Sequence, residues 1–210
     1  VGVVDLLPAG GAQTVESIIK QGGQATFVQA DVSEWAEVDG LVGKIVAQLG
    51  PLGIVVNAAG ILDGYAPARE MAPALWTKVI AINLTGTFFA CKRALEDMVP
   101  AGRGRIINLA SVAGISGAGG GPADVASKRQ LAITYADRGV TVNAICPGVI
   151  QTGLRANSTT ILGADAPVMR GIGGDEVAIK AVTPAGRRGT VEEIAAAARL
   201  QAAIAAHGKK

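Results

Sequence analysis

Short apolar runs alternate along the chain with longer stretches in which apolar residues recur at helical spacing. The runs have the length and β-branched content of buried parallel strands, and they lie at residues 1–5, 25–30, 53–58, 105–109 and 140–146. The intervening stretches predict amphipathic helices, at residues 9–21, 34–49, 74–98 and 123–137. Strands that alternate with helices form βαβ units, so the pattern predicts an α/β fold with a parallel sheet and flanking helices.

The pattern changes after Pro147. Residues 151–189 are rich in Gly, Ala, Thr and Pro, which predicts a mobile loop or lid over a substrate site. The last helix has a clear start, because Thr190 followed by Glu193 forms a capping-box pattern. No internal repeat or low-complexity linker divides the sequence, so residues 1–210 are expected to form a single domain.

Composition narrows the class of protein. Half of the 210 residues are hydrophobic and only 3% are aromatic, which predicts a core of Val, Ile, Leu and Ala. The net charge is +2 and the basic residues are scattered, so we expect no nucleic-acid partner. No signal peptide and no run of eighteen apolar residues are evident, which predicts a cytoplasmic protein without a membrane partner. Cys91 and Cys146 are expected to be reduced thiols, and His207, the only histidine, argues against a metal site.

The segment from Ser111 to Lys128 carries the clearest chemical signal. It resembles the active-site segment of the short-chain dehydrogenase/reductase family, in which a serine is followed thirteen residues later by a tyrosine and four residues after that by a lysine. Ser111 and Lys128 match, but Asp124 stands at the tyrosine position. The resemblance implies a Rossmann-like sheet, NAD(H) as cofactor, and a secondary alcohol or ketone as the small-molecule substrate.

Further motifs match the same family in order and spacing. Asn83 matches an asparagine that organises water in the proton relay, and Lys128 is also implied to hold the nicotinamide ribose. Asp5 matches an acid that binds the adenosine ribose hydroxyls, which implies NAD(H) rather than NADP(H). The other implied cofactor-binding residues lie after the second, third and fifth predicted strands: Asp31, Val32, Asn57, Ala58, Ala59, Gly60, Pro147, Gly148 and Thr152.

Each of these residues also has a purely structural interpretation. The side chains of Asn57 and Asn83 are also suited to forming hydrogen bonds with nearby backbone groups. Ser111 is suited to a turn, and Asp5 is suited to capping the end of a strand. Asp124 and Lys128 are spaced as an i,i+4 ion pair on a helix. With the tyrosine absent, this ion pair is the interpretation of Asp124 that we favour.

The sequence departs from the family in ways that affect function. A carboxyl group has a pKa of about 3.9, which a lysine one turn away lowers. We therefore expect Asp124 to be a carboxylate near neutral pH, with no proton to donate. We expect the chain to lack the family's first strand, the glycine-rich turn that follows it, and the family's last strand. The helix that contains Lys128 is expected to be about seven residues shorter than in the family. Without the central first strand, either residues 1–5 close onto residues 53–58 or another segment or chain fills the space.

Two functions therefore remain open. One is an NAD(H)-dependent oxidoreductase of this family, impaired by the change at Asp124. The other is a non-catalytic scaffold or binding protein derived from the family. Members of the family associate through their two long helices and last strand. Because one of these helices is expected to be short and the last strand to be lacking, we expect a monomer or an altered dimer. The sequence does not identify the substrate.

Overall fold

The computed structural model describes residues 1–116, 120–127, 136–171 and 175–204. Its five strands form two parallel sheets. β1 (Gly2–Asp5) pairs with β2 (Thr26–Gln29), while β4 (Gly104–Leu109) lies between β3 (Ile54–Asn57) and β5 (Val140–Ile145). All five predicted strands are thus confirmed within one residue at each end, and every pairing is parallel.

In the described residues β1 does not pair with β3, so the two sheets are separate and the alternative in which residues 1–5 close onto residues 53–58 is wrong. Each strand keeps its own helix partners instead.

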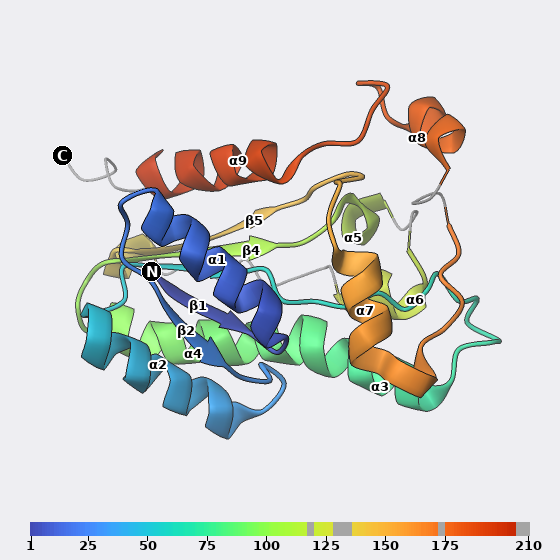
Figure 1. Cartoon of the computed structure of the whole chain (residues 1–210). Helices are drawn as coiled ribbons and strands as arrows, with labels where there is room; N and C mark the ends of the chain where they lie inside the picture. The colour runs from blue at the N-terminus through green and yellow to red at the C-terminus, as the bar shows by residue number, and fades with distance from the viewer. Residues whose placement is uncertain (117–119, 128–135, 172–174, 205–210) are drawn as a thin grey trace.

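Helices cover both faces of the sheets (Figure 1). α1 (Pro8–Lys20) packs on β1 and β2, and α9 (Val191–Ile204) packs on β4 and β5. On the opposite face, α2 (Trp35–Leu49) packs on β2, and α4 (Thr87–Met98) packs on β3 and β4. This three-layer arrangement is the α/β architecture that the alternating pattern predicts.

The predicted helix at 74–98 is continuous but not uniform. α3 (Pro73–Ile80) leads into a π-helical segment, η1 (Ala81–Gly86), which leads into α4. A Cβ atom at Gly86 would lie 2.7 Å from a side-chain carbon of Val32, so the small residue permits the helix to approach β2's end. By length and composition alone Pro73–Met98 could cross a membrane, but a core helix passes the same test, and a third of its most apolar window is buried.

Two predicted segments require correction. Residues 151–189, expected to be a loop, contain α7 (Leu154–Leu162), the 3-10 turn η3 (Gly163–Asp165) and α8 (Glu176–Val182). The predicted helix at 123–137 is described as α6 (Pro122–Ser127) and a 3-10 turn, η2 (Ala136–Arg138); α5 (Val112–Ser116) precedes it. Residues 128–135 of that prediction lie outside the described residues, as does His207.

The core consists of three clusters of aliphatic side chains. One packs α4 against β4 and β5 around Met98 and Ile106, and another packs α2 against β1 and β2 around Ile45. Leu52, in the loop between α2 and β3, packs against both clusters and so connects the two sheets. The third cluster, around Ile61 and Val79, lies below the carboxyl ends of the strands. Both cysteines are free thiols, as expected, although only Cys91 is fully buried.

Candidate active site

The candidate site lies where the strands end. Asn57 and Asn108 occupy paired positions at the ends of β3 and β4, and the Asn57 side-chain amide donates to the Asn108 Oδ1 at 2.8 Å. The same amide lies 3.4 Å from the Cys91 sulfur, and burial raises the pKa of the Cys91 thiol. The amide of Asn57 is therefore held below the edge, whereas Ala58 and Ala59 directly after it are exposed.

Asp5 ends β1 at the corresponding edge of the other sheet. Its Oδ1 accepts a hydrogen bond from the main-chain N–H of Leu7 at 2.8 Å, which fixes the carboxylate at the turn into α1. A strand-end acid oriented in this way retains a second oxygen that a ribose hydroxyl group can approach. The geometry thus fits both interpretations of Asp5, the cap and the ribose acceptor.

Asp31 and Val32, after β2, make protein contacts. The Asp31 carboxylate accepts hydrogen bonds from the Ser33 N–H and hydroxyl at 2.9 and 2.6 Å, and Lys78 lies 3.4 Å away. Burial raises the pKa of Asp31, but the Ser33 hydrogen bonds and the Lys78 charge outweigh this effect and lower it. Val32 packs on the third core cluster. These contacts account for both residues without a cofactor.

Asn83 lies in the π-helical segment η1 and is fully buried. Its side-chain oxygen accepts from the Ile61 N–H at 2.8 Å, and its amide donates to the Ile61 carbonyl at 2.9 Å and to the Ser127 hydroxyl at 3.3 Å. The side chain therefore connects η1, the loop after β3, and α6. The residue that the family comparison assigns to water organisation acts here, through its side chain, as a clamp on the site's backbone.

Ser111 and Asp124 lie on neighbouring segments, because α5 packs against α6. The half-buried Ser111 hydroxyl accepts from the Ala113 N–H at 3.1 Å, as expected for a turn serine. Asp124 is only 4% exposed, and its main-chain N–H donates to the Asp63 Oδ2 at 2.9 Å. Asp124 is thus not a surface residue, and its ion pair with Lys128 stays a prediction. Lys128 lies outside the described residues.

Asp63 is the residue that sequence reasoning missed. It is fully buried, and it accepts from the main-chain N–H groups of Tyr65 and Asp124. A Cβ atom at Gly121 would lie 2.5 Å from the Asp63 carboxylate, so the chain can pass there only with glycine. The Asp63-Gly64 pair indicates a turn, but nothing in the sequence indicates its partner 61 residues away.

Tyr65 lies over this acidic pair. It is the only non-glycine residue of the described chain with a positive φ, at 58°, and Gly171 approaches its ring so closely that a Cβ atom there would lie 3.0 Å away. Burial, with the charges of Asp124 and Asp63, raises the pKa of Tyr65, although Arg155 opposes this. A raised pKa makes a phenol a weaker acid.

Pro147, Gly148 and Thr152 follow β5 at the same edge. The Pro147 carbonyl accepts a hydrogen bond from the Val112 N–H at 3.0 Å. The Thr152 hydroxyl accepts a hydrogen bond at 3.3 Å from the N–H of Leu154, the first residue of α7. Gly148 is exposed, and a Cβ atom on it would meet nothing within 4 Å. The segment therefore joins the β5 end to both α5 and α7.

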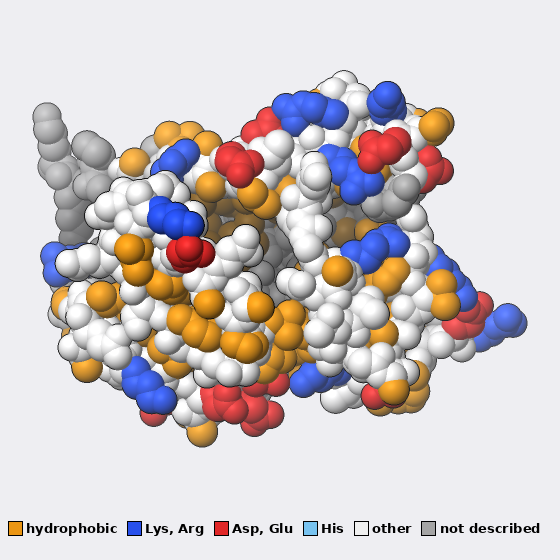
Figure 2. Space-filling view, viewed as in Figure 1, with side chains coloured by type: hydrophobic (Ala, Val, Ile, Leu, Met, Phe, Trp, Pro, Cys, Tyr) orange, Lys and Arg blue, Asp and Glu red, His pale blue; other side chains and the backbone are white. Residues whose placement is uncertain are grey.

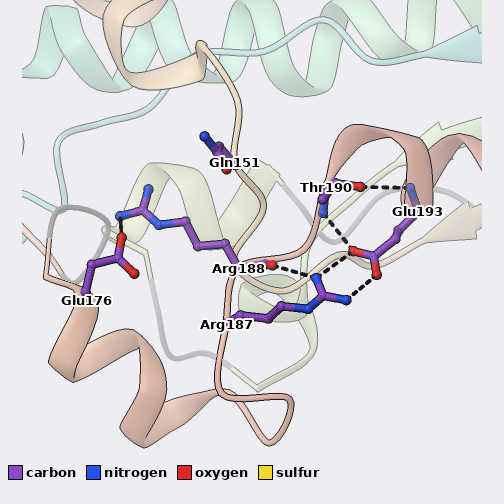
Figure 3. A pocket seen from close by; sticks show the side chains of 6 residues that line it. All are labelled: Gln151, Glu176, Arg187, Arg188, Thr190 and Glu193. Carbon is purple, nitrogen blue, oxygen red and sulfur yellow. Dashed lines mark hydrogen bonds and ion pairs between the residues drawn. The ribbon is translucent and has the colours of Figure 1, made fainter.

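A pocket of about 630 Å³ opens between the loop after β5, α8 and the start of α9 (Figure 3). Its charged side chains are paired: Arg187 contacts Glu193 at 2.6 Å, and Arg188 contacts Glu176 at 2.9 Å. Three of its lining residues, Gln151, Arg187 and Arg188, belong to non-helical parts of the 151–189 segment, and Glu176 belongs to α8. Within the described ranges, no three His, Cys, Asp or Glu side chains converge as metal ligands.

Residues 1–161 match the family described as short chain dehydrogenase, and the chain belongs to that family. It is 34% identical over 195 residues to a 3beta-hydroxysteroid dehydrogenase 2 from Eggerthella lenta, covering 89% of this chain and 72% of that protein. It is also 36% identical over 203 residues to a Xanthobacter autotrophicus protein named inactive 2-(S)-hydroxypropyl-CoM dehydrogenase 2, covering 93% and 84%.

Solved structures agree. The chain resembles levodione reductase with a TM-score of 0.83 at 29% identity, covering 96% of this chain and 80% of that one. It resembles a gluconate 5-dehydrogenase from Burkholderia cenocepacia J2315, solved with NADP and tartrate, with a TM-score of 0.79 at 26% identity, covering 98% and 80%. The Rossmann-like fold predicted from the family motifs is confirmed.

Proposed function

We propose that this chain is an NAD(H)-binding oxidoreductase of its family whose reaction on a secondary alcohol or ketone is impaired. The observation that carries the proposal is the position of Asp124. It is buried on α6, held through its N–H by Asp63, and followed on the same helix by Ser127, which contacts Asn83. The framework of an active site is retained, but a carboxyl group occupies the proton-donor position.

The edge of the strands fits a dinucleotide. Small residues after β3, the exposed Ala58 and Ala59 and the half-buried Gly60, allow close approach to the backbone, and Asp5 offers a carboxylate at the end of β1. When bound, the nicotinamide would accept or supply the hydride. We assign the ribose contact to Asp5 and the backbone contacts to residues 58–60 and 147–148. Asp31 and Val32 are left out of this assignment because protein contacts occupy them.

The proton step is where the chain is weakened. We assign Ser111 to orienting a substrate oxygen and Lys128 to the nicotinamide ribose, both by their places in the family motif. Oxidation of the alcohol requires a group that accepts its proton, and reduction of the ketone one that donates it. A carboxylate has no proton to donate, and as a weak base it accepts one poorly from an alcohol, so an aspartate is a poor substitute for the family's tyrosine. We therefore expect slow turnover.

A non-catalytic scaffold or binding protein is the second candidate. The same Asp124 substitution favours it, and so does the similarity to a relative whose name describes it as inactive. Titration with NADH separates the two, followed by Trp35 and Trp76 fluorescence and by an assay of NAD reduction with secondary alcohols. Saturable binding with slow turnover supports the oxidoreductase. Absence of both supports the scaffold and contradicts the first proposal.

We also propose that association is limited to a monomer or an altered dimer. Trp76 and Phe88, on the helical stretch Pro73–Met98, remain 41% and 44% exposed. Apolar side chains of this size on one helix are suited to a subunit interface. Light scattering tests this proposal, and a stable tetramer would contradict it.

A further inference from the structure

The pocket of about 630 Å³ shares no lining residue with the positions assigned above to the cofactor and the reaction. Its walls are polar, since Gln151 and Thr190 line it together with two Arg–Glu pairs. The space-filling view shows basic and acidic side chains over α8 and over the loop between α8 and α9 (Figure 2). A cavity of this volume is in the range that holds small molecules, so its polar groups indicate which kind of molecule fits.

The pair of Arg187 and Glu193 is closed to a ligand. Both terminal nitrogens of Arg187 donate to the Glu193 carboxylate, at 3.1 and 2.6 Å, and one of them also donates to the Arg188 carbonyl at 2.8 Å. The Glu193 carboxylate accepts in addition from the Thr190 N–H at 2.8 Å. A ligand that replaced either partner would have to break several of these bonds together.

The pair of Arg188 and Glu176 is easier to open. The Arg188 Nη2 lies 2.9 Å from the Glu176 Oε1, while the Arg188 Nε is buried without an acceptor anywhere in the described chain. The Arg188 side chain is 25% exposed, and that of Glu176 is 66% exposed. Because the exposed carboxylate can return to water while the more buried guanidinium keeps an unmatched donor, another acceptor can replace Glu176 at little cost.

The unmatched donor has the geometry of a carboxylate site. In a guanidinium group, Nε–H and one terminal N–H point the same way, and together they match the two oxygens of a carboxylate. Figure 3 shows the Arg188 side chain extending toward Glu176 and away from the Arg187–Glu193 pair. A ligand carboxylate in the place of Glu176 can accept from both N–H groups, and it thereby supplies the acceptor that Nε lacks.

The backbone around Arg188 is fixed by contacts within the chain. The Gly189 N–H donates to the Val149 carbonyl at 2.9 Å, and the Gly189 carbonyl accepts from the Gln151 N–H at 2.9 Å. These bonds join the two segments in a short parallel bridge, and the Asp175 side chain caps the start of α8. The walls of the pocket are therefore held in place, which reduces the ordering cost of binding.

We propose that this pocket binds a small hydroxylated carboxylate, with the Nε and Nη2 of Arg188 as its anchor. The Gln151 amide and the Thr190 hydroxyl line the same cavity and are suited to the ligand's hydroxyl groups. A phosphate dianion fits less well, because Glu176 and Glu193 place two negative charges at the cavity.

NMR titration of the full chain with galactonate tests the proposal. The readout is the side-chain Nε–H signal of Arg188, identified by its loss in Arg188→Lys. We expect a saturable downfield shift with galactonate and none with the neutral galactonamide. Arg188→Lys keeps the charge but loses the fork, so galactonate affinity measured by calorimetry should fall about ten-fold or more. Neither cofactor nor turnover enters these measurements, so the result is independent of the proposed function.

Glu176→Gln removes the group that competes for Arg188, so it should tighten galactonate binding about three-fold or more. Glu70→Gln is the matched control: it opens the 2.8 Å pair with Arg170 outside the pocket and should leave the affinity unchanged. The proposal is overturned if galactonamide or phosphate binds as tightly as galactonate, or if no binding occurs at tens of millimolar galactonate. Unchanged affinity in Arg188→Lys or in Glu176→Gln would also overturn it.

Discussion

Asp63 and Asp124 are joined by a hydrogen bond of 2.9 Å from the main-chain N–H of Asp124 to the Asp63 carboxylate. The bond connects the loop after β3 to the helix that carries the proton-donor position. Since Asp63 is fully buried, water cannot replace the contact. The position of Asp124 in the site thus depends on a residue outside every recognised motif.

Asp63→Ala should destabilise the protein. The substitution leaves the N–H groups of Tyr65 and Asp124 without their acceptor, at a cost of about 1–3 kcal/mol for each buried donor that stays unsatisfied. Urea unfolding measures the loss. Asp63→Asn, which keeps one oxygen and the volume, should lose less. An Asp63→Ala variant as stable as the starting protein would show that the contact does not hold α6.

Gly121→Ala should destabilise the same region by a different route. Its new Cβ atom would lie 2.5 Å from the Asp63 carboxylate, so the carboxylate or the chain must move. We expect a loss of about 1–3 kcal/mol by overpacking. Gly40→Ala in α2 is the control: a Cβ atom there meets nothing within 4 Å, so it should gain up to about 1 kcal/mol. Similar effects of both would contradict the packing argument.

Acid should weaken the start of α9 through Glu193. Hydrogen bonds from Arg187 and the Thr190 N–H lower the pKa of Glu193 to about 2. Because the folded pKa is lowered, the stabilisation is present above the unfolded value of about 4.3 and is lost as the pH falls through about 2. Urea midpoints at pH 7, 5 and 3 should therefore fall more in the starting protein than in Glu193→Gln. Glu192→Gln, which removes a neighbouring charge without these contacts, should behave like the starting protein.

Cofactor preference should depend on Asp5. A carboxylate at the ribose accepts bonds from a free 2′-hydroxyl and repels a 2′-phosphate, so NADH should outcompete NADPH. Asp5→Asn should reduce this preference about ten-fold or more in competition binding. Asp31→Asn serves as the control, because Ser33 and Lys78 hold that carboxylate, and it should leave the preference unchanged. Equal or tighter NADPH binding by the starting protein would place Asp5 away from the ribose.

Asp124→Tyr alone should not produce an efficient enzyme. General acid–base groups contribute about 10² to 10⁴-fold, but hydride transfer also needs the nicotinamide within about 3 to 3.5 Å of the substrate carbon. The site around Asp124 is too buried to admit a tyrosine in this position without movement. NAD reduction with a panel of secondary alcohols measures the effect. A kcat/KM of about 10⁴ M⁻¹s⁻¹ or more would contradict this account.

The sequence by itself determined the features that depend on local patterns. Apolar runs placed all five strands, because a buried strand needs only a few consecutive apolar residues. The capping box at Thr190 and Glu193 was predicted and is confirmed, with hydrogen bonds of 2.8 and 3.3 Å, because both partners lie within one helical turn. Motif spacing alone was sufficient to indicate the family.

Tertiary structure decided the features that depend on distant residues. α7 and α8 lack a strong apolar period. Their stability rests partly on contacts such as the Leu62 N–H to Ser158 hydroxyl bond across 96 residues and on the Asp175 cap. The π-helical segment around Asn83 accompanies side-chain bonds to Ile61. Burial of Asp124 and the role of Asp63 follow likewise from packing between segments that no local pattern encodes.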